Sequence, residues 1–477
     1  MTVAARVEPG NGIAALEVSA DTLTPVAAAL RLRDRLAFIL ESVEGGARYG
    51  RYSFVGVRGR TVVVDGDEAV VWGPDYAELE RFPTADPLEA LRRVLPAGGN
   101  DPSFPFPMAA GVGYLSYEAA ARWERLPVPE ANPIGLPEAL FHVPDVVIAF
   151  DHLAQTATLA TVGTPGADGR LAAVAAQLAR PVPDEAPRAV RHASERRRVH
   201  PPERDPRYEA GVAELVREIR AGEMLQAVLA RRFTFPATAP ALEIYRALRR
   251  INPSPHLFAI DLGPGRSILG ASPELLVRVR DGEVVTRPIA GTRPRSDDPV
   301  RDAELEADLL ADEKELAEHA MLVDLARNDV GRIAEVGSVE WPVLYAIERF
   351  SHVMHISSEV RGRLRAGLDA FDAVRSTFPA GTLSGAQKVR AMESIARLED
   401  EKRGPYGGAV GFFSPTDVEA AITIRSVVLR DGMAYVNAGA GIVADSVPER
   451  ESAEVAAKAA AVLAALGETE AAMEGGA

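Results

Sequence analysis

Three Asp-Gly pairs, each set between two runs of strand-forming residues, place the strongest limit on how this chain folds. They are Asp65-Gly66, Asp281-Gly282 and Asp431-Gly432. Asp-Gly is a preferred centre of a two-residue hairpin, so each pair predicts two antiparallel strands joined directly. Long helical stretches separate the hairpins instead of alternating with single strands. This order predicts an α+β fold rather than a parallel β-α-β sheet.

A change in composition divides the chain. Residues 181–206 are crowded with proline and charged residues and hold few apolar ones, which predicts a linker. We therefore expect a smaller mixed N-terminal domain over 13–180, a larger domain over 207–466 and a flexible tail over 467–477. Within the first domain, residues 25–40 are predicted to form a helix.

Length, charge and cysteine content exclude several classes of protein. With 477 residues the chain is long enough for two or three domains. Its net charge of −15 argues against a nucleic-acid partner. No apolar run approaches the roughly 20 residues of a membrane span, and the N-terminus lacks the pattern of a signal peptide. The absence of cysteine excludes disulfides and cysteine nucleophiles and fits a cytoplasmic location.

The stretch DEKELAEHAMLVDLARNDVGR, residues 312–332, predicts a long helix. It has no proline, good helix formers throughout and Gly331 where a helix would end. Glu315 and Glu318 lie three residues apart and share one side of that helix. Apolar residues occupy both sides, so we expect the helix to be buried together with its two carboxylates.

A second helix, predicted over residues 448–466, places Glu451, Glu454 and Lys458 on one face. Two carboxylates a few ångströms apart repel by roughly 4 kcal/mol at an effective dielectric of 20. If the two helices meet, their four glutamates need a cation, and ligands that are all oxygen favour Mg²⁺. The alternative is that these glutamates are solvated helix surface.

Glycine-rich segments predict a site for a small anion. Gly439-Ala440-Gly441 loosely matches a dinucleotide-binding motif, but too little chain follows it to complete that fold. A better interpretation is a loop whose backbone N–H groups approach an anion, with a helix N-terminus just beyond. Further donors lie in similar glycine-rich settings or in a predicted strand: Thr292, Arg293, Thr382, Tyr406 and, in the strand, Arg425. Together they indicate a dicarboxylate, although any one of these turns alone is more often structural.

The pair His352 and His355 does not predict a zinc site. Both lie in a strand-like run, where residues three apart face opposite sides. A single histidine acting as an acid or a base is the better interpretation.

Seven motifs in one order resemble the chorismate-binding enzymes. They are PIAGTRPR, DEKELAEHAMLVDLARNDVGR, HVMH, FPAGTLSGAQK, RGPYGGAVG, AITIRS and NAGAGIVADSVPERE. The resemblance covers most of residues 207–466 and reaches the first domain through LESVEGGARYGRYSF. It implies a large antiparallel-sheet fold with helices packed outside. Gln387 stands where the family usually has proline, beside the site.

The resemblance also implies roles for individual residues. Glu318 and Glu454 would bind Mg²⁺, supported by Glu315 and Glu451. The substrate would be held by Gly291, Thr292, Tyr406, Arg425, Gly439, Ala440, Gly441 and Lys458. Glu274 is similar to the family's general acid at the C4 hydroxyl of chorismate. His355 would serve the loss of pyruvate, and Thr382 would support the leaving group.

Two positions select among the family's activities. Relatives that form aminodeoxychorismate are expected to carry a lysine nucleophile where this chain has Ala290, and isochorismate synthases are expected to carry a lysine base where it has Gln226. Without either lysine, the resemblance implies ammonia as the nucleophile and anthranilate and pyruvate as the products, in the first step of tryptophan synthesis. The alternatives are a relative that stops at the amino intermediate and an inactive tryptophan-sensing subunit.

A partner and an inhibitor follow from the same resemblance. Glutaminases of the relevant class use a cysteine, so ammonia would come from a separate glutamine amidotransferase subunit, in an assembly of two large and two small subunits. Feedback inhibition by L-tryptophan is implied by motifs that supply the residues Leu40, Ser42, Pro255, His256 and Leu257. Val410 and Phe412 are further candidates for contact with the indole. The alternative is that the NPSP segment before His256 is only a turn.

Overall fold

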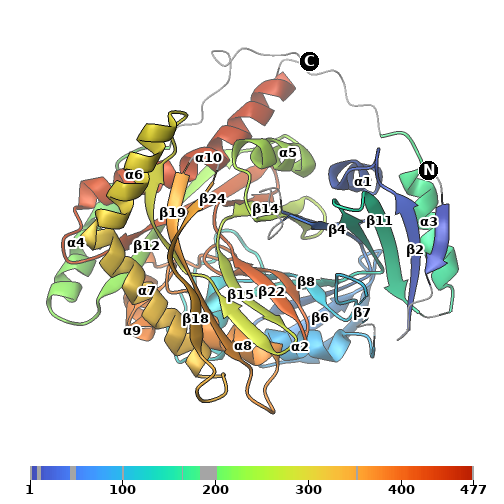
Figure 1. Ribbon diagram of the computed structural model, residues 1–477, viewed down its shortest axis with the longest axis horizontal. Coiled ribbons are helices and arrows are strands. Elements are labelled where there is room, and N and C mark those ends of the chain that lie inside the picture. The colour runs from blue at the N-terminus through green and yellow to red at the C-terminus, as the bar shows by residue number, and fades with distance from the viewer. Residues whose placement is uncertain are drawn as a thin grey trace.

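Two large antiparallel sheets form the centre of the molecule (Figure 1). The computed structural model describes residues 3–7, 12–42, 50–98, 101, 103–163, 165–182, 201–350 and 353–474. Within them, the first sheet has the order β1 (Val3–Val7), β2 (Ile13–Ser19), β11 (Thr156–Val162), β10 (Val146–Asp151), β4 (Tyr52–Val57), β3 (Leu36–Glu41), β13 (His256–Asp261), β14 (Arg266–Ser272), β23 (Ser426–Arg430), β24 (Met433–Ile442), β12 (Gln226–Pro236) and β20 (Gly385–Ala386).

The second sheet lies beneath the first in the view of Figure 1. Its order is β17 (Ile289–Pro294), β19 (Val353–Arg363), β16 (Glu283–Thr286), β15 (Leu275–Arg280), β22 (Val418–Ile422), β21 (Ala409–Phe413), β8 (Gly111–Leu115), β9 (Ala139–Val143), β5 (Arg60–Asp65), β6 (Glu68–Trp72) and β7 (Glu78–Pro83), with β18 (Glu340–Arg349) paired to β19. Strands from before and after the predicted linker share both sheets.

Helices cover the outer faces of the sheets. They are α1 (Pro25–Arg31), α2 (Pro87–Val94), the 3-10 helix η1 (Tyr117–Arg122), α3 (Ala167–Leu178), α4 (Pro206–Arg220), α5 (Ala241–Ile251), α6 (Pro299–Ala311), α7 (Glu313–Gly331), α8 (Ala370–Thr377), α9 (Lys388–Glu399) and α10 (Pro448–Glu474). Helices α4, α5 and α10 pack with the first sheet, while α6, α7 and α8 pack with the second. The inner faces of both sheets meet in an aromatic core that includes Phe38, Phe106, Tyr114, Phe258 and Phe412.

The three predicted hairpins are confirmed. Asp65-Gly66 joins β5 to β6, Asp281-Gly282 joins β15 to β16, and Asp431-Gly432 joins β23 to β24. Each glycine has a positive φ, of 60°, 73° and 79° respectively. These are the backbone angles for which a hairpin turn prefers glycine. The predicted α+β class is therefore correct.

The helix predicted over 25–40 is wrong in its second half. Helix α1 ends at Arg31, and Leu36–Glu41 is strand β3. The strand lies inside the first sheet between β4 and β13, so nearly all of its side chains are buried. A continuous apolar run of this kind suits a strand buried on both faces, and its periodicity does not separate it from a buried helix.

Helix α7 begins and ends almost where the sequence predicted. Asp312 caps it by accepting hydrogen bonds from the N–H groups of Lys314 and Glu315, and the helix ends at Gly331. The prediction that it is buried on all sides is wrong, because only one face packs against β17 and β19. Glu315 and Glu318 are half-buried, and Ala320 is exposed.

The predicted linker and the predicted C-terminal tail differ in their outcomes. The predicted linker lies mostly outside the described residues, which lack 183–200. The tail predicted from residue 467 is helical as far as Glu474. No helix within the described ranges is long and apolar enough to cross a membrane.

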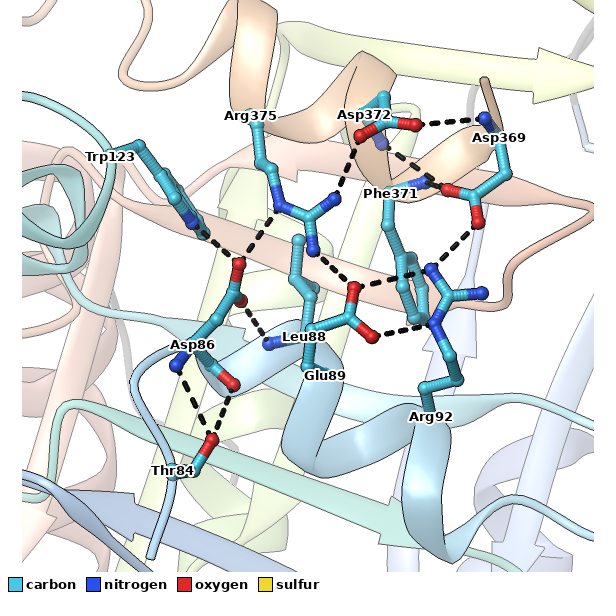
Figure 2. Close-up of polar contacts among 10 residues, drawn as sticks. All are labelled: Thr84, Asp86, Leu88, Glu89, Arg92, Trp123, Asp369, Phe371, Asp372 and Arg375. Atoms are coloured by element: carbon cyan, nitrogen blue, oxygen red, sulfur yellow. Dashed lines mark hydrogen bonds and ion pairs between the residues drawn. The ribbon is translucent and has the colours of Figure 1, made fainter. Parts of the chain in front are cut away.

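A polar network joins α2 to α8 and so ties the N-terminal part to the part that follows the linker (Figure 2). Arg375 of α8 contacts Asp86 at 2.9 Å, Glu89 at 2.6 Å and its own neighbour Asp372 at 2.8 Å. Asp86 also accepts a hydrogen bond from the indole of Trp123. The network fixes the end of α8, from which the chain runs directly to Thr382.

Candidate active site

Glu274 lies in the short turn between β14 and β15, and its side chain is buried, with 7% of the residue exposed. The Thr382 hydroxyl donates a hydrogen bond of 3.1 Å to its Oε1. Burial raises the pKa of Glu274 to about 8, although that hydrogen bond and the charges of Arg425 and Lys458 act in the opposite direction. The carboxyl group is therefore protonated at neutral pH and can donate a proton.

His355 on β19 faces the bulge within β17 that holds Gly291 and Thr292. Its Nδ1 lies 2.8 Å from the Gly291 carbonyl oxygen and 3.1 Å from the Thr292 hydroxyl. A carbonyl oxygen can only accept, so Nδ1 carries the proton and Nε2 keeps its lone pair. Burial lowers the pKa of His355 to about 4, so the ring is neutral and can act as a base.

The glycines at 439 and 441 lie within strand β24, so the prediction of a loop is wrong. Residues 439–441 pair with β12, and a Cβ atom at Gly441 would lie only 2.3 Å from Gln226 Nε2. A Cβ atom at Gly439 would lie 3.0 Å from the Tyr406 hydroxyl oxygen. The glycines are needed because neighbouring atoms come close to the strand backbone. At Gly439 the nearest is the Leu229 carbonyl oxygen of β12, 2.8 Å from where a Cβ atom would lie, and at Gly441 it is the Gln226 side chain.

Arg425 lies between β22 and β23 rather than in a strand, which corrects the sequence prediction. Its backbone is left-handed, with φ of 49°, and its Nη1 donates a hydrogen bond of 3.4 Å to Asn252 Oδ1. On α10, Lys458 donates a hydrogen bond of 3.2 Å to the Gly439 carbonyl. Both cations lower the pKa of Glu274 and of His355, so their charges act on one small region. Such a region favours an anion beside a proton donor and a base.

The four glutamates predicted to bind a metal lie at the N-terminal ends of α7 and α10. Burial and the neighbouring Glu318 raise the pKa of Glu315, and burial and Glu454 raise that of Glu451. Lys314 Nζ lies 3.6 Å from Glu318 Oε1, and the charge of Lys314 also acts to lower the pKa of Glu451. The two helix ends are therefore close enough for their charges to interact.

These four carboxylates do not form a complete set of metal ligands. Lys458 Nζ lies 2.7 Å from Glu454, whose side chain is half exposed. Across the described ranges, no three acidic or histidine side chains converge closely enough to hold a metal ion. The donor chemistry, all carboxylate oxygen, fits a hard divalent cation. Lys314 and Lys458 pair with Glu318 and Glu454 on their own helices, so a bound cation would compete with these two ammonium groups.

Known proteins with similar sequences and structures show the family to which the chain belongs. The family described as chorismate binding enzyme matches residues 37–464. The chain is 44% identical to anthranilate synthase component 1 of Streptomyces coelicolor, over 95% of this chain and 88% of that protein. It is 43% identical to the protein of the same name from Thermus thermophilus, over 94% and 96%. The chain belongs to the anthranilate synthase component I family of chorismate-binding enzymes.

The solved structures agree with this membership. The crystal structure of anthranilate synthase component I from Streptococcus pneumoniae TIGR4 aligns with a TM-score of 0.76 and 35% identity, covering 94% of this chain and 99% of that one. The menaquinone-specific isochorismate synthase from Escherichia coli aligns with a TM-score of 0.71 at 20% identity, which shows the shared fold alone.

The residues predicted to bind an inhibitor gather around one small open cavity of about 80 Å³. Its lining includes all five predicted residues and the two additional candidates: Leu40, Ser42, Pro255, His256, Leu257, Val410 and Phe412. A second cavity, of about 720 Å³, shares Ser42, Pro255, His256 and Phe412 with it, and this larger space suits a small organic ligand. The Ser42 hydroxyl is buried and has no hydrogen-bond partner within the part of the chain that the structure describes.

Sequence reasoning missed the buried charges that support the site. Arg403 is 2% exposed and donates to the carbonyls of Val228 and Leu383 while pairing with Glu399. It thereby fixes the segment that carries Tyr406 to β12 and to the Thr382 loop. The RGPYGG motif is the only local signal, because nothing in the sequence shows that an arginine is buried.

Proposed function

We propose that the protein converts chorismate and ammonia to anthranilate and pyruvate. The observation that carries this proposal is the protonated, buried carboxyl of Glu274, held by Thr382 beside the charges of Arg425 and Lys458. Such an arrangement suits a dicarboxylate substrate that loses a hydroxyl group. The two positions that carry catalytic lysines in the sister enzymes are Ala290 and Gln226, so ammonia is the remaining nucleophile.

In the first step, ammonia forms a bond to C2 of chorismate, both ring double bonds shift, from C1=C2 to C1=C6 and from C5=C6 to C4=C5, and the C4–O bond breaks. The new ammonium group releases a proton to solvent. Glu274 gives its proton to the departing hydroxyl, which leaves as water. Arg425 and Lys458 hold the substrate carboxylates, and Thr382 stabilises the carboxylate left on Glu274.

In the second step, His355 is the base that takes the proton from C2. The C3–O bond then breaks, the ring becomes aromatic, and the enolpyruvyl group takes up a proton to leave as pyruvate. The hydrogen bond from Nδ1 to the Gly291 carbonyl holds the imidazole with Nε2 available for this proton.

We further propose Mg²⁺ as the cofactor. Glu318 and Glu454 would hold it, with Glu315 and Glu451 in support. When bound, the ion supplies positive charge that neutralises these carboxylates and attracts the ring carboxylate of the substrate. The half exposure of Glu315, Glu318 and Glu451 supports access from solvent.

A separate glutamine amidotransferase subunit is the proposed source of ammonia in a cytoplasmic assembly of two large and two small subunits. The chain has no cysteine to serve as a glutaminase nucleophile, and the relatives carry the name component 1. The isolated chain should be inactive with glutamine and active with ammonium. Robust glutamine-dependent turnover by the chain alone would contradict this proposal.

L-Tryptophan is the proposed feedback inhibitor, bound in the cavity lined by Ser42, Pro255 and Leu257. The unpartnered Ser42 hydroxyl would bond the polar end of the amino acid, and the apolar wall would pack on its indole. Ser42→Phe fills the cavity and should raise the tryptophan concentration needed for inhibition at least tenfold. Unchanged inhibition would refute the assignment.

One assay tests the main proposal against its alternatives. Purified protein is incubated with chorismate, Mg²⁺ and ammonium, and anthranilate is followed by its fluorescence. We expect anthranilate and pyruvate in equal amounts. Accumulation of the amino intermediate would favour a synthase that stops halfway, and no turnover together with tryptophan binding would favour an inactive sensing subunit.

A further inference from the structure

Arg293, the residue after Thr292 on β17, touches three separate carboxylates. Its Nε lies 2.6 Å from Asp308 of α6, and its Nη2 lies 2.8 Å from Asp312, the cap of α7. Its Nη1 donates a hydrogen bond of 3.1 Å to the Thr292 carbonyl and lies 3.9 Å from Glu315. One planar guanidinium therefore joins the bulge of β17 that holds Gly291 and Thr292 to helices α6 and α7.

Helix α6 has little apolar anchorage, so charges must hold it. Leu309 is its only buried residue, and it packs with Met354 and Ile356 in a small cluster. Leu305 of α6 is partly buried against the same cluster, and three ion pairs with arginines in or next to the sheet add to this anchorage. They are Arg293 with Asp308, Arg295 with Asp302, and Arg349 with Glu306.

Arg293 differs from the other two arginines because it also reaches the start of α7. Asp312 accepts hydrogen bonds from the N–H groups of Lys314 and Glu315, at 3.1 and 3.3 Å. The side chain of Glu315 lies close to Gly291, where a Cβ atom would come within 3.3 Å of Glu315 Oε2. The position of this glutamate thus depends on the cap, and the cap depends on Arg293.

We infer that Arg293 is a positioning residue for the acidic site on α7. It keeps the Glu315 carboxylate at a fixed position beside the Gly291–Thr292 bulge of β17. This inference rests on the proposed function, since it concerns the proposed magnesium site. A lysine keeps the charge but cannot bond several carboxylates in one plane, so charge alone is not sufficient for the role. Removing such a supporting partner of a metal ligand typically costs tenfold or more in metal affinity.

The test is isothermal titration of the full-length protein with MgCl₂, for wild type, Arg293→Lys, Arg293→Gln and Arg295→Gln. We expect both Arg293 variants to bind Mg²⁺ at least tenfold more weakly. Arg295→Gln is the matched control, because Arg295 also holds α6 but contacts Asp302 and the Phe350 carbonyl rather than Asp312 or Glu315. It should bind Mg²⁺ within about threefold of wild type, and circular dichroism melts should show that the Arg293 variants lose no more stability than Arg295→Gln.

Three results would overturn the inference. If Arg293→Lys matches wild type, charge rather than geometry matters. If Arg295→Gln loses as much affinity, the role is only to anchor α6, and the same holds if the loss follows a drop in melting temperature. If wild type does not bind Mg²⁺, both the metal site and this role fail. A separate assay for anthranilate reports the proposed function, so magnesium binding that depends on Arg293 without turnover would refute the function alone.

Discussion

The hydroxyl of Thr382 should control the pH range over which the enzyme works. Glu274 acts as an acid only while protonated, and burial raises its pKa to about 8. Turnover should therefore fall as the pH rises through about 8. The Thr382 hydroxyl donates to Glu274 Oε1 and favours the ionised form. Thr382→Val removes this bond, so the pKa of Glu274 should rise and the loss of activity should move to higher pH.

The size of the shift follows from the strength of the bond in the two states of the carboxyl group. A hydrogen bond to a charged group contributes about 1.5–3 kcal/mol and one to a neutral group about 0.5–1.5 kcal/mol. The difference of about 1–1.5 kcal/mol corresponds to roughly one pH unit. The variant's maximal rate should also fall, because the carboxylate formed in the transition state loses a donor.

The assay measures kcat from pH 6 to 10 with saturating chorismate and Mg²⁺. Total ammonium is adjusted so that free ammonia is constant, because ammonia itself titrates in this range. Thr382→Ser keeps the hydroxyl and serves as the control, and its alkaline limb should stay near that of wild type.

An alkaline limb that stays in place or moves to lower pH in Thr382→Val would refute this reasoning. Substantial activity in Glu274→Gln would refute it more directly, because the amide cannot supply the proton.

Three further predictions concern stability and packing. Because burial raises the pKa of Glu274 from 4.5 to about 8, the contribution of this group to stability is fully present below pH 4.5 and is lost as the pH rises through about 8. Glu274→Gln should therefore gain stability over wild type at pH 9 but not at pH 4, by at most roughly 5 kcal/mol, and urea unfolding at both pH values measures the difference. Arg375→Gln in the network of Figure 2 should destabilise the protein by about 2 kcal/mol, since it leaves Asp86 without its cation and Glu89 with Arg92 alone. Arg301→Gln, in an exposed pair with Glu304, should change stability by less than about 0.5 kcal/mol in the same urea titration. Gly441→Ala should lower kcat at least tenfold, because its Cβ would displace Gln226. The control is Gly282→Ala, where no atom lies within 4 Å of the added Cβ; it should affect stability and leave kcat near wild type. Equal losses of kcat in both variants would contradict this explanation.

Local sequence signals identified the parts of the site that depend on neighbouring residues in the chain. The Asp-Gly pairs fixed the hairpins, and the helix from Glu313 to Gly331 follows from its composition and its Asp312 cap. The same signals failed at Leu36–Glu41, where an apolar run is a strand because other strands surround it on both sides. They also failed at Gly439, where the β12 backbone and Tyr406 take the space, and at Gly441, where Gln226 does.

Residue types and their order along the chain were sufficient to indicate a polyanion, a cation and a histidine acid or base, because carboxylates, arginines, glycines and histidines have limited chemical uses. The proton donor Glu274 was indicated only by the resemblance to the family. Which of these groups act together was decided by the tertiary structure alone. Burial turns Glu274 into an acid near pH 8, and the contact with Gly291 assigns the proton of His355. Lys314 and Lys458 pair with the glutamates of α7 and α10, and Arg293 links α7 to the bulge of β17 that holds Gly291 and Thr292. Protonation states and distances depend on surroundings supplied by remote segments, which no local stretch of sequence contains.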